Sequence, residues 1–371
     1  MSTIVVPREP ASAFSWQTGW RYGLFGLPLA FAALPLYVLL PNHYARTYGL
    51  GLGALGALLL AVRLLDTVID PWLGRLADRL LACVPAVLLR WAALAAALLC
   101  LGFALLFFPP QAWANSGDHR LWVWLGASLL LTTLAYSGLS ILHQAWGARL
   151  GGDDVQRSRV VAWREGFGLL GVICASVSPL VLGLSGATAI LIVACGGAWL
   201  AWRWLARQLL LTAPAGAVSA VGSGASLWQP WMRADFRRLL AVFMLNGIAS
   251  AVPATLILFF VQDRLQAPPS MEPVFLGSYF LCAALALPVW LRVVNRLGLA
   301  RTWALGMSLA LGVFAFAAQL QAGDSTAFVW VCALSGVAMG TDLALPAALL
   351  NGQIQAHGER GRAEGAYFGW W

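Results

Sequence analysis

Two carboxylates and a guanidinium lie close together in one apolar stretch of the sequence. Residues 63–71 read Arg-Leu-Leu-Asp-Thr-Val-Ile-Asp-Pro. In a helix, Asp66 and Asp70 share a face, and Arg63 lies one turn before Asp66 on the same side. Two ionised carboxylates on one face repel each other, which raises their affinity for a cation or proton placed between them. The spacing predicts a cation-coupling site formed by Asp66, Asp70 and Arg63; a structural ion-pair network, or a water-exposed Asp70, is the alternative.

Other polar side chains also interrupt apolar runs. An ionisable group in a membrane-spanning helix costs roughly a few kcal/mol, so it needs a partner and becomes a functional candidate. Arg164 follows Trp163 at the edge of one run, His143 and Gln144 lie near the end of another, and Asp342 stands one turn before a helix-breaking proline. We predict that these five residues contact a small-molecule solute. For His143, a packing role is an equal alternative.

No group of residues has the spacing of a catalytic or metal-binding site. The sequence has 4 histidines, none spaced with Cys or carboxylates as ligands, and its 6 cysteines stand singly in apolar stretches. We therefore expect no catalytic residues, no metal site and no cofactor other than a coupling ion, H⁺ or Na⁺. A membrane-bound enzyme or a non-transporting membrane protein is the competing interpretation.

The composition places the chain in a lipid bilayer. Of 371 residues, 60% are hydrophobic and 10% are charged, and the mean hydropathy is +0.77. Continuous apolar runs such as residues 92–108 exceed the strands of a β-barrel and predict spanning helices. The net charge of +8 comes from arginines in loops, so it does not indicate a nucleic-acid partner.

Apolar runs and helix breakers predict ten spanning helices, near residues 22–42, 50–76, 84–108, 121–146, 160–182, 187–211, 236–261, 273–294, 302–321 and 328–353. With the N-terminus in the cytoplasm, 17 of the 23 arginines fall in cytoplasmic segments, 3 in the opposite loops and 3 at membrane depth. This asymmetry follows the positive-inside rule. We predict a multi-pass protein of the plasma membrane, a bacterial inner membrane, with its N-terminus in the cytoplasm.

The order of these helices indicates a duplicated six-helix unit. Residues 1–211 would form a six-helix bundle, residues 212–235 a cytoplasmic linker rich in Gly, Ala, Ser and Pro, and residues 236–371 an incomplete second bundle. Four helices of the second bundle precede a stub in which Tyr367, Phe368, Trp370 and Trp371 begin an eleventh helix. The predicted class is an all-α membrane bundle, and we expect little or no activity from a chain without its two closing helices.

A short polar loop recurs in both halves of the chain. Residues 74–79 read Gly-Arg-Leu-Ala-Asp-Arg, and a partial echo follows at residues 294–301. The loop resembles the short Gly, Asp and Arg loop of the major facilitator superfamily. That resemblance implies a gating loop of Gly74, Asp78 and Arg79, in which the Asp caps a helix and pairs with Arg across the bundle. A generic polar turn is the alternative.

Three strings resemble the glycoside-pentoside-hexuronide:cation symporter family (melibiose permease-like). They are RLLDTVIDPWLGRLADR at residues 63–79, Tyr22-Gly23, and HGERGRAEG at residues 357–365. The resemblance implies that Asp66 and Asp70 bind the coupling Na⁺ or H⁺ and that Arg164 contacts sugar. The resemblance in the order of the predicted helices covers most of the chain. Matching motifs occur only in these strings and around residues 121–182.

The sequence also departs from that family. Ile69 stands where melibiose permease-like members carry Asn, and Leu139 lies near the position of a threonine ligand, with Ser137 and Ser140 close by. A Na⁺ site needs several oxygens whereas a proton needs one carboxylate, so these losses favour H⁺ coupling. Pro28 and Leu142 replace two sugar-binding acids, which makes a galactoside substrate doubtful.

We predict secondary active symport by alternating access, in which protonation of Asp66 and Asp70 determines which side of the membrane opens. A sugar or glycoside is the favoured solute, and a carrier of amphiphiles or drugs on the same fold is the alternative. The expected partners are the solute and the lipid bilayer, and the expected state is a monomer.

Overall fold

Apolar runs fold as helices in this chain because a bilayer offers no partner for unpaired backbone groups. The computed structural model describes residues 15–113, 119–150, 152–212 and 226–371. Within these ranges the secondary structure is helical and holds no β-strand, which confirms the predicted all-α class. Nine helical segments in this part are long and apolar enough to cross a membrane, and one bent pair would make ten.

The first predicted span, at residues 22–42, is a bent series of short helices. α1 (Trp16–Gly23) and α2 (Gly26–Leu34) lead through a π-helical turn (Pro35–Leu39) into α3 (Leu40–Thr47). Pro35 and Pro41 lack the backbone N–H that a regular helix needs, and the direction changes by 41° between Trp16–Tyr37 and Leu40–Thr47. The span is therefore longer than predicted and bent.

The next spans agree closely with the predicted ranges. α4 (Leu52–Ala82), α5 (Pro85–Phe107) and α6 (His119–Leu150) each cover one predicted helix. α7 (Asp154–Thr212) contains two predicted spans, which meet at Gly183. Gly183 has a φ of +69°, a conformation that costs glycine little and other residues more, so the break falls there.

Among the described residues after α7, six further α-helices follow: α8 (Gln229–Met232), α9 (Ala234–Phe259), α10 (Glu272–Leu297), α11 (Leu299–Ala317), α12 (Ser325–Ala356) and α13 (Glu364–Trp370). Most of the predicted linker, residues 213–225, lies outside the described residues. α13 contains three of the four aromatic residues predicted to begin a further helix.

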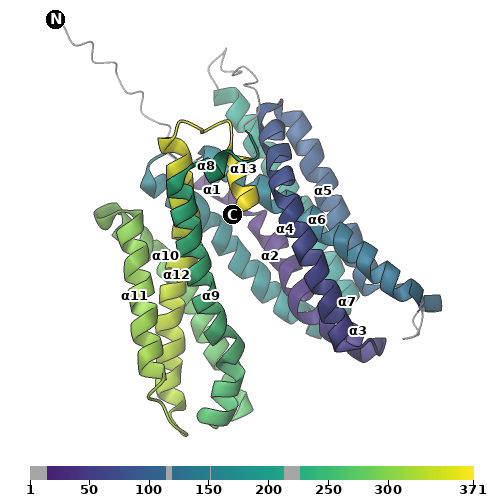
Figure 1. The fold of residues 1–371 in the computed structure, drawn as a ribbon, viewed down its shortest axis with the longest axis vertical. Coiled ribbons are helices and arrows are strands. Elements are labelled where there is room, and N and C mark those ends of the chain that lie inside the picture. Colours follow the sequence, from purple (N-terminus) through teal and green to yellow (C-terminus); the bar gives the residue numbers. More distant parts are fainter. Residues whose placement is uncertain (1–14, 114–118, 151, 213–225) are drawn as a thin grey trace, which may run out of the picture.

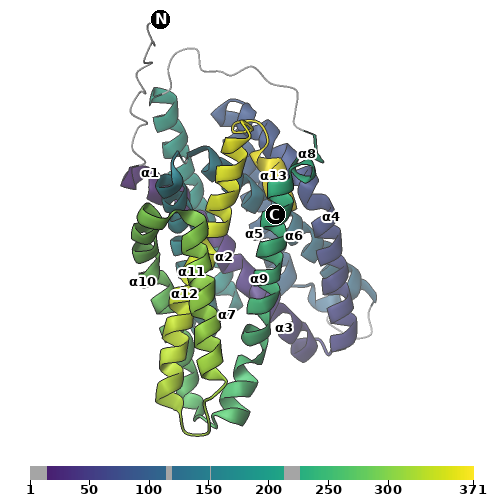
Figure 2. The same cartoon turned by 60° about the vertical axis from the view of Figure 1, so that its left-hand side comes forward.

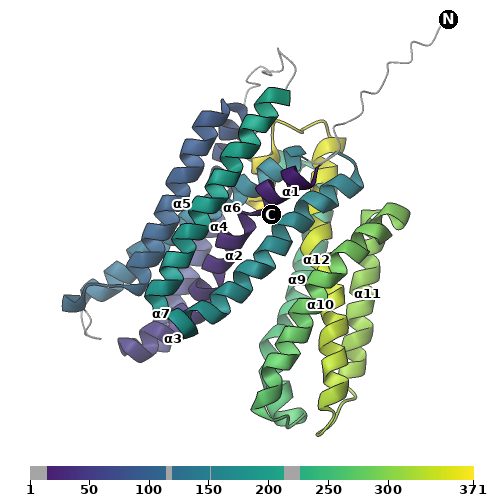
Figure 3. The same cartoon turned by 180° about the vertical axis from the view of Figure 1, so that it is seen from behind.

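The helices form two groups that meet at one end of the molecule (Figures 1 and 3). α1 to α7 make one group. α9 to α12, continued by α13, make the other, and α13 packs against α4 and α6 of the first group. We call the meeting end, where α4, α6 and α12 finish, the arginine-rich end; Figure 2 shows α8 and α13 next to each other there. At the opposite end, α9 to α12 have an apolar core of their own, separate from the main core, made by Val261, Leu265, Phe275, Val313, Ala317, Leu320, Phe328, Val331 and Cys332.

Candidate functional site

On α4, the Asp66 carboxylate points into the helix bundle, whereas large apolar side chains point outward. Asp66 is 3% exposed, whereas Leu64 and Val68 are 60% and 66% exposed. For a helix in lipid this arrangement is favourable, since hydrocarbon faces apolar groups and the charged group faces the bundle interior. Asp66 therefore depends on partners from neighbouring helices.

Ser137 on α6 is the inter-helix partner of Asp66. Its hydroxyl lies 2.9 Å from Asp66 Oδ1 and 3.1 Å from Oδ2, and it donates to this carboxylate. Ser137 is itself buried. A hydrogen bond to a carboxylate in such a place is strong because water does not compete for the acceptor. The contact fixes Asp66 against α6.

Arg63 pairs with Asp66 from the same helix. Arg63 Nη1 lies 3.6 Å from Asp66 Oδ2, and the guanidinium carbon lies 4.0 Å from the ring centre of Tyr37, close enough for a cation–π contact. The Arg63 side chain is 46% exposed, however, so the ion pair is open on one side. The predicted proximity of Arg63 to Asp66 is confirmed.

Asp70 lies one turn beyond Asp66 and is half-buried. Its Oδ1 atom is buried and has no hydrogen-bond partner among the described residues. Two carboxylates and the Ser137 hydroxyl thus supply oxygens that could hold a proton or a monovalent cation. In the described part of the chain, no group of three or more His, Cys, Asp and Glu side chains has the arrangement of a metal site.

Arg164 belongs to a second polar group, between α7, α1 and α6. Its Nε and Nη2 atoms donate to Glu165 Oε1 at 2.8 and 2.6 Å. Tyr22, Tyr136 and His143 are its electrostatic neighbours. A partly buried guanidinium with one carboxylate partner and phenol groups around it could bind a neutral polyhydroxy solute, since it retains donors that Glu165 does not use.

His143 belongs to α6, contacts Tyr22 of α1 and is fully buried. Its Nε2 donates to the carbonyl oxygen of Tyr22 at 3.0 Å, and the Tyr22 hydroxyl donates to the carbonyl oxygen of His143 at the same distance. The imidazole also packs against the rings of Phe25 and Trp202. These are the contacts expected of His143 in a packing role, which was the alternative raised from the sequence.

The remaining predicted solute residues lie in three different places. Trp163 packs on α1, where a Cβ on Gly19 would overlap its ring. Gln144 donates to the Ser140 hydroxyl at 3.3 Å. Asp342, on α12 in the other group of helices, accepts a hydrogen bond from Trp303 Nε1 at 2.7 Å. Within the described residues, no hydrogen bond or ion pair joins Asp342 to Arg164.

The predicted gating loop contacts α13. Asp78 Oδ1 accepts from the Gly365 N–H at 2.6 Å, and Oδ2 accepts from the Ala366 N–H at 2.9 Å, so Asp78 satisfies free donors at the start of this short helix. Gly74 and Gly365 meet backbone to backbone, because a Cβ on either would overlap the carbonyl oxygen of the other. Arg79 is exposed and does not take part.

Further contacts join the two groups of helices at the arginine-rich end. Glu364 is fully buried and pairs with Arg149, whose Nη2 lies 3.3 Å from Glu364 Oε2. Arg360 Nη2 donates to the Arg149 carbonyl oxygen at 2.7 Å, and Arg157 Nη1 donates to Gln355 Oε1 at 2.7 Å. Together with the Asp78 contacts, these bonds tie residues 355–366 to α4, α6 and α7 at the arginine-rich end.

Glu359 anchors the segment around α8 to α13. Its Oε1 accepts from Arg233 Nη2 at 2.6 Å and Gln229 Nε2 at 2.9 Å, while Oε2 accepts from the Tyr367 hydroxyl at 2.7 Å. Burial alone would raise the pKa of Glu359, but hydrogen bonds from Tyr367, Gln229 and Arg233 outweigh burial and hold it below its ordinary value.

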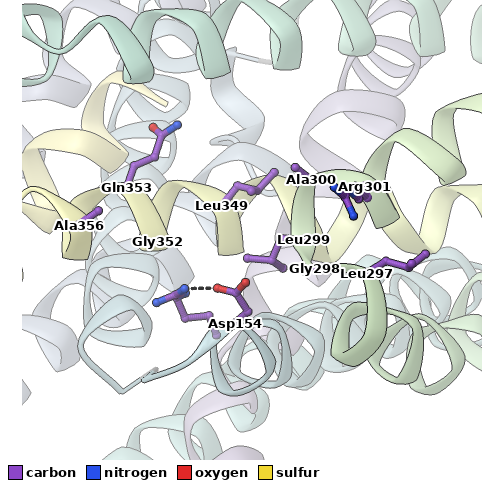
Figure 4. A pocket seen from close by; sticks show the side chains of 11 residues that line it. Asp154, Leu297, Gly298, Leu299, Ala300, Arg301, Leu349, Gly352, Gln353 and Ala356 are labelled. Carbon is purple, nitrogen blue, oxygen red and sulfur yellow. Dashed lines mark hydrogen bonds and ion pairs between the residues drawn. The ribbon is translucent and has the colours of Figure 1, made fainter.

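A pocket of about 470 Å³ opens beside these contacts (Figure 4). It lies between the start of α7, the turn from α10 to α11, and the last turns of α12. Arg157 lines it and pairs with Asp154. Asp154 is labelled in Figure 4, where a dashed line meets its carboxylate. None of the predicted solute residues lines it, so this pocket is separate from the polar group around Arg164.

A comparison with known families decides the identity. The family model described as MFS/sugar transport protein matches residues 21–371. The chain belongs to this family. It is a multi-pass membrane transporter of the major facilitator superfamily (MFS), which confirms the superfamily resemblance drawn from residues 74–79.

A relative in Escherichia coli (strain K12) agrees with this assignment. YagG, named as a candidate glycoside/cation symporter, is 28% identical over 145 residues. The aligned segment covers 38% of this chain and 30% of YagG, so the chain spans less than a third of the length of that relative in the match.

Solved structures of other transporters share the fold. A bacterial homologue of the iron transporter ferroportin, in an outward-facing state, superimposes with a TM-score of 0.66 at 15% identity over 96% of this chain and 89% of that one. The proton:xylose symporter XylE gives 0.58 at 14% identity, covering 96% and 84%. FucP in an outward conformation gives 0.57 at 16% identity, covering 96% of each. At these identities the likeness shows the fold of an MFS transporter alone.

Sequence reasoning missed several residues of the contact network. Arg149 and Glu364 form a buried ion pair, and Arg233 and Glu359 form a second ion pair; none of the four was proposed for a role. Glu359 and Glu364 do fall within the quoted string HGERGRAEG, so a signal was present for them. Arg149 and Arg233 carried no signal beyond their place in arginine-rich segments.

Proposed function

We propose that this MFS transporter is a cation-coupled symporter of a small sugar or glycoside, with H⁺ as the coupling ion and Na⁺ as the alternative. The observation that carries the proposal is the buried Asp66 carboxylate, hydrogen-bonded to Ser137 and one turn from a second carboxylate with an unpartnered oxygen. A buried acid of this kind in a transporter commonly marks a proton or ion path.

The oxygens at this site favour a proton over Na⁺. Ile69 and Leu139 contribute no side-chain oxygen, so the neutral ligand nearest to the carboxylates is the Ser137 hydroxyl. A proton needs only one carboxylate oxygen, and Asp70 Oδ1 is free to accept it. A second carboxylate one turn away increases the affinity of the pair for that proton.

The solute is proposed to bind next to Arg164, where α7 faces α1 and α6. The match to YagG supports a glycoside, and the surroundings of Arg164 suit hydroxyl groups. Pro28 and Leu142 occupy positions where the related symporters carry sugar-binding acids, which argues against galactosides. An amphiphile or drug carrier on the same fold is the competing function.

The arrangement of the helices supports alternating access. The bonds between the two groups lie at the arginine-rich end, and the far ends of α9 to α12 pack on a core of their own. We propose that this conformation is open to the side opposite the arginine-rich end. A cation at Asp66 and Asp70 would bias the exchange between this state and its inverse. The arginine-rich end is proposed to be cytoplasmic, in a bacterial inner membrane.

Transport by the full-length protein in proteoliposomes tests the coupling. Asp66→Asn and Asp70→Asn are compared with Asp263→Asn, which neutralises an exposed carboxylate. Labelled pentoses, hexoses and glycosides are offered under an imposed pH gradient or Na⁺ gradient, with an entrapped pH dye. We expect pH-driven accumulation of one sugar class, abolished by both site variants and unchanged in Asp263→Asn. Uptake unaffected by both site variants would disprove the coupling assignment, and accumulation driven only by Na⁺ would select the alternative ion.

A further inference from the structure

An apolar groove of about 280 Å³ runs along the outer surface of the first group of helices. α4 and α5 form its walls and α6 its floor. The residues that define it include Leu73 and Ala77 of α4, Leu94 and Leu98 of α5, and Leu134 and Gly138 of α6. Leu94 is 48% exposed and Trp91, also on the wall, is 45% exposed, so in a membrane the groove is open to lipid.

Two arginines lie on the rim of this groove, near the arginine-rich end. Arg79 is one turn before the end of α4, and Arg90 is within the first two turns of α5. Arg79 is three residues from Leu76 and Arg90 four residues from Leu94, so each lies on the same helix side as a lining residue. Both are exposed, and neither has a hydrogen bond or ion pair with the described residues. Two positive charges near a membrane surface therefore have no protein counter-charge at this site.

We propose that the groove binds one acidic phospholipid, with an acyl chain between α4, α5 and α6 and the headgroup phosphate between Arg79 and Arg90. Hydrocarbon fits the apolar walls, and an anion complements the two guanidiniums, each of which can donate two parallel hydrogen bonds to phosphate oxygens. Zwitterionic lipid lacks the net negative charge. The groove begins about two helical turns beyond Asp66, toward the arginine-rich end of α4, and its occupation does not depend on the transported solute.

The space next to Gly138 allows a larger side chain to be placed in the groove, which tests whether the groove holds lipid. A Cβ at Gly138 would lie 3.9 Å and 4.0 Å from the two Cδ atoms of Leu73, which is ordinary contact. Gly138→Leu should therefore fill part of the groove without disturbing the backbone. Arg79→Gln with Arg90→Gln removes the headgroup contacts, and Arg301→Gln, an exposed arginine at the same end but outside the groove, is the matched control.

Native mass spectrometry of the delipidated full-length protein measures the binding. It is titrated with phosphatidylglycerol and with phosphatidylcholine of the same acyl chains. We expect one phosphatidylglycerol bound more tightly than phosphatidylcholine, with affinity about 30-fold lower in the double arginine variant, since each interfacial charge contributes about 5-fold. Gly138→Leu should weaken both lipids, and Arg301→Gln should bind as the unchanged protein does.

Two outcomes would overturn the proposal. One is equal affinity for the two lipids in the unchanged protein, which would remove the acidic headgroup from the site. The other is unchanged phosphatidylglycerol affinity in both the double arginine variant and Gly138→Leu, which would place the lipid elsewhere. If the double variant cannot be purified, Arg79→Gln and Arg90→Gln are measured singly, with about 5-fold expected for each.

Discussion

The Ser137 hydroxyl on α6 bridges both carboxylate oxygens of Asp66 on α4, at 2.9 Å and 3.1 Å. This contact ties the predicted coupling residue to a neighbouring helix, so any ion that binds Asp66 also acts on the packing of α4 against α6. The same hydroxyl could act as a neutral ligand for Na⁺. A proton bound to a carboxylate oxygen needs no such ligand. The two coupling ions can therefore be separated by one substitution.

Ser137→Ala should change the response to H⁺ and Na⁺ in opposite directions. A hydrogen bond to a charged group contributes about 1.5–3 kcal/mol, and its loss disfavours the ionised carboxylate. Half-saturation of uptake should then require about 10-fold less H⁺, whereas a Na⁺ site would lose a ligand and require more Na⁺. Cation titrations of uptake measure this, with Ser308→Ala as the control, since among the described residues that exposed serine on α11 bonds only the Ala304 carbonyl of its own helix. Identical titrations for Ser137→Ala and the unchanged protein would remove Ser137 from the site.

Gly365→Ala should separate α13 from α4. A methyl group at Gly365 would overlap the carbonyl oxygen of Gly74, and overpacking of this kind costs about 1–3 kcal/mol. We expect a lower melting temperature in detergent and faster labelling of a cysteine placed at the arginine-rich end. Gly312→Ala is the control, because nothing lies within 4 Å of a Cβ there and alanine favours the helix. Equal melting temperatures for the two variants would contradict the close contact.

Glu359 should make stability depend on pH in the acid range. Its pKa in the folded protein lies below the ordinary 4.5, so the ionised form favours folding. That stabilisation is complete above about pH 4.5 and is lost as the pH falls through the lower value of the folded state. Melting curves from neutral pH to about pH 4 and below should show a loss in the unchanged protein that is smaller in Glu359→Gln. Asp263→Asn should retain the full loss; an equally steep loss in Glu359→Gln would refute the assignment.

His143→Ala should reduce stability more than Gln144→Ala does. The His143 ring loses a buried hydrogen bond to Tyr22 and its contacts with Phe25 and Trp202, for a cost of about 2–4 kcal/mol. Gln144 donates only a 3.3 Å hydrogen bond to Ser140 in the described residues. Thermal unfolding and solute binding are measured on both variants. A His143→Ala protein of normal stability with lost solute binding would favour direct contact with the solute.

The sequence predicted those parts of the molecule that depend on local spacing. Asp66 and Asp70 share a helix side because they are four residues apart, and the helical stretch at Tyr367 and Phe368 follows from its composition. That Asp78 caps a helix was anticipated only through the resemblance to a family, and the identity of that helix, α13, was not anticipated. Ser137 was noted as close to the site, but the contact with Asp66 depends on how α6 is rotated against α4, which no local pattern reveals.

Errors and omissions arose where packing between helices decides the outcome. The first span is bent because Pro35 and Pro41 interrupt its hydrogen bonding, whereas its apolar run predicted one helix over residues 22–42. Trp163 adjoins Arg164 in sequence but packs against Gly19 of α1, because consecutive residues of a helix point in directions about 100° apart. Residue type alone does not reveal this contact with α1, and the contact of Trp163 with a solute stays a prediction.

The backbone contact of Gly74 with Gly365 bears on how often this transporter can cycle. Glycine has no side-chain rotamers to immobilise, so closing this seam does not carry the entropic cost of ordering long side chains. Reopening it likewise requires no rotamer to reset. In the alternating access proposed above, this contact would form and separate in each cycle without any rearrangement of glycine side chains. The bonds of Asp78 and Glu364 would then determine how long it stays closed.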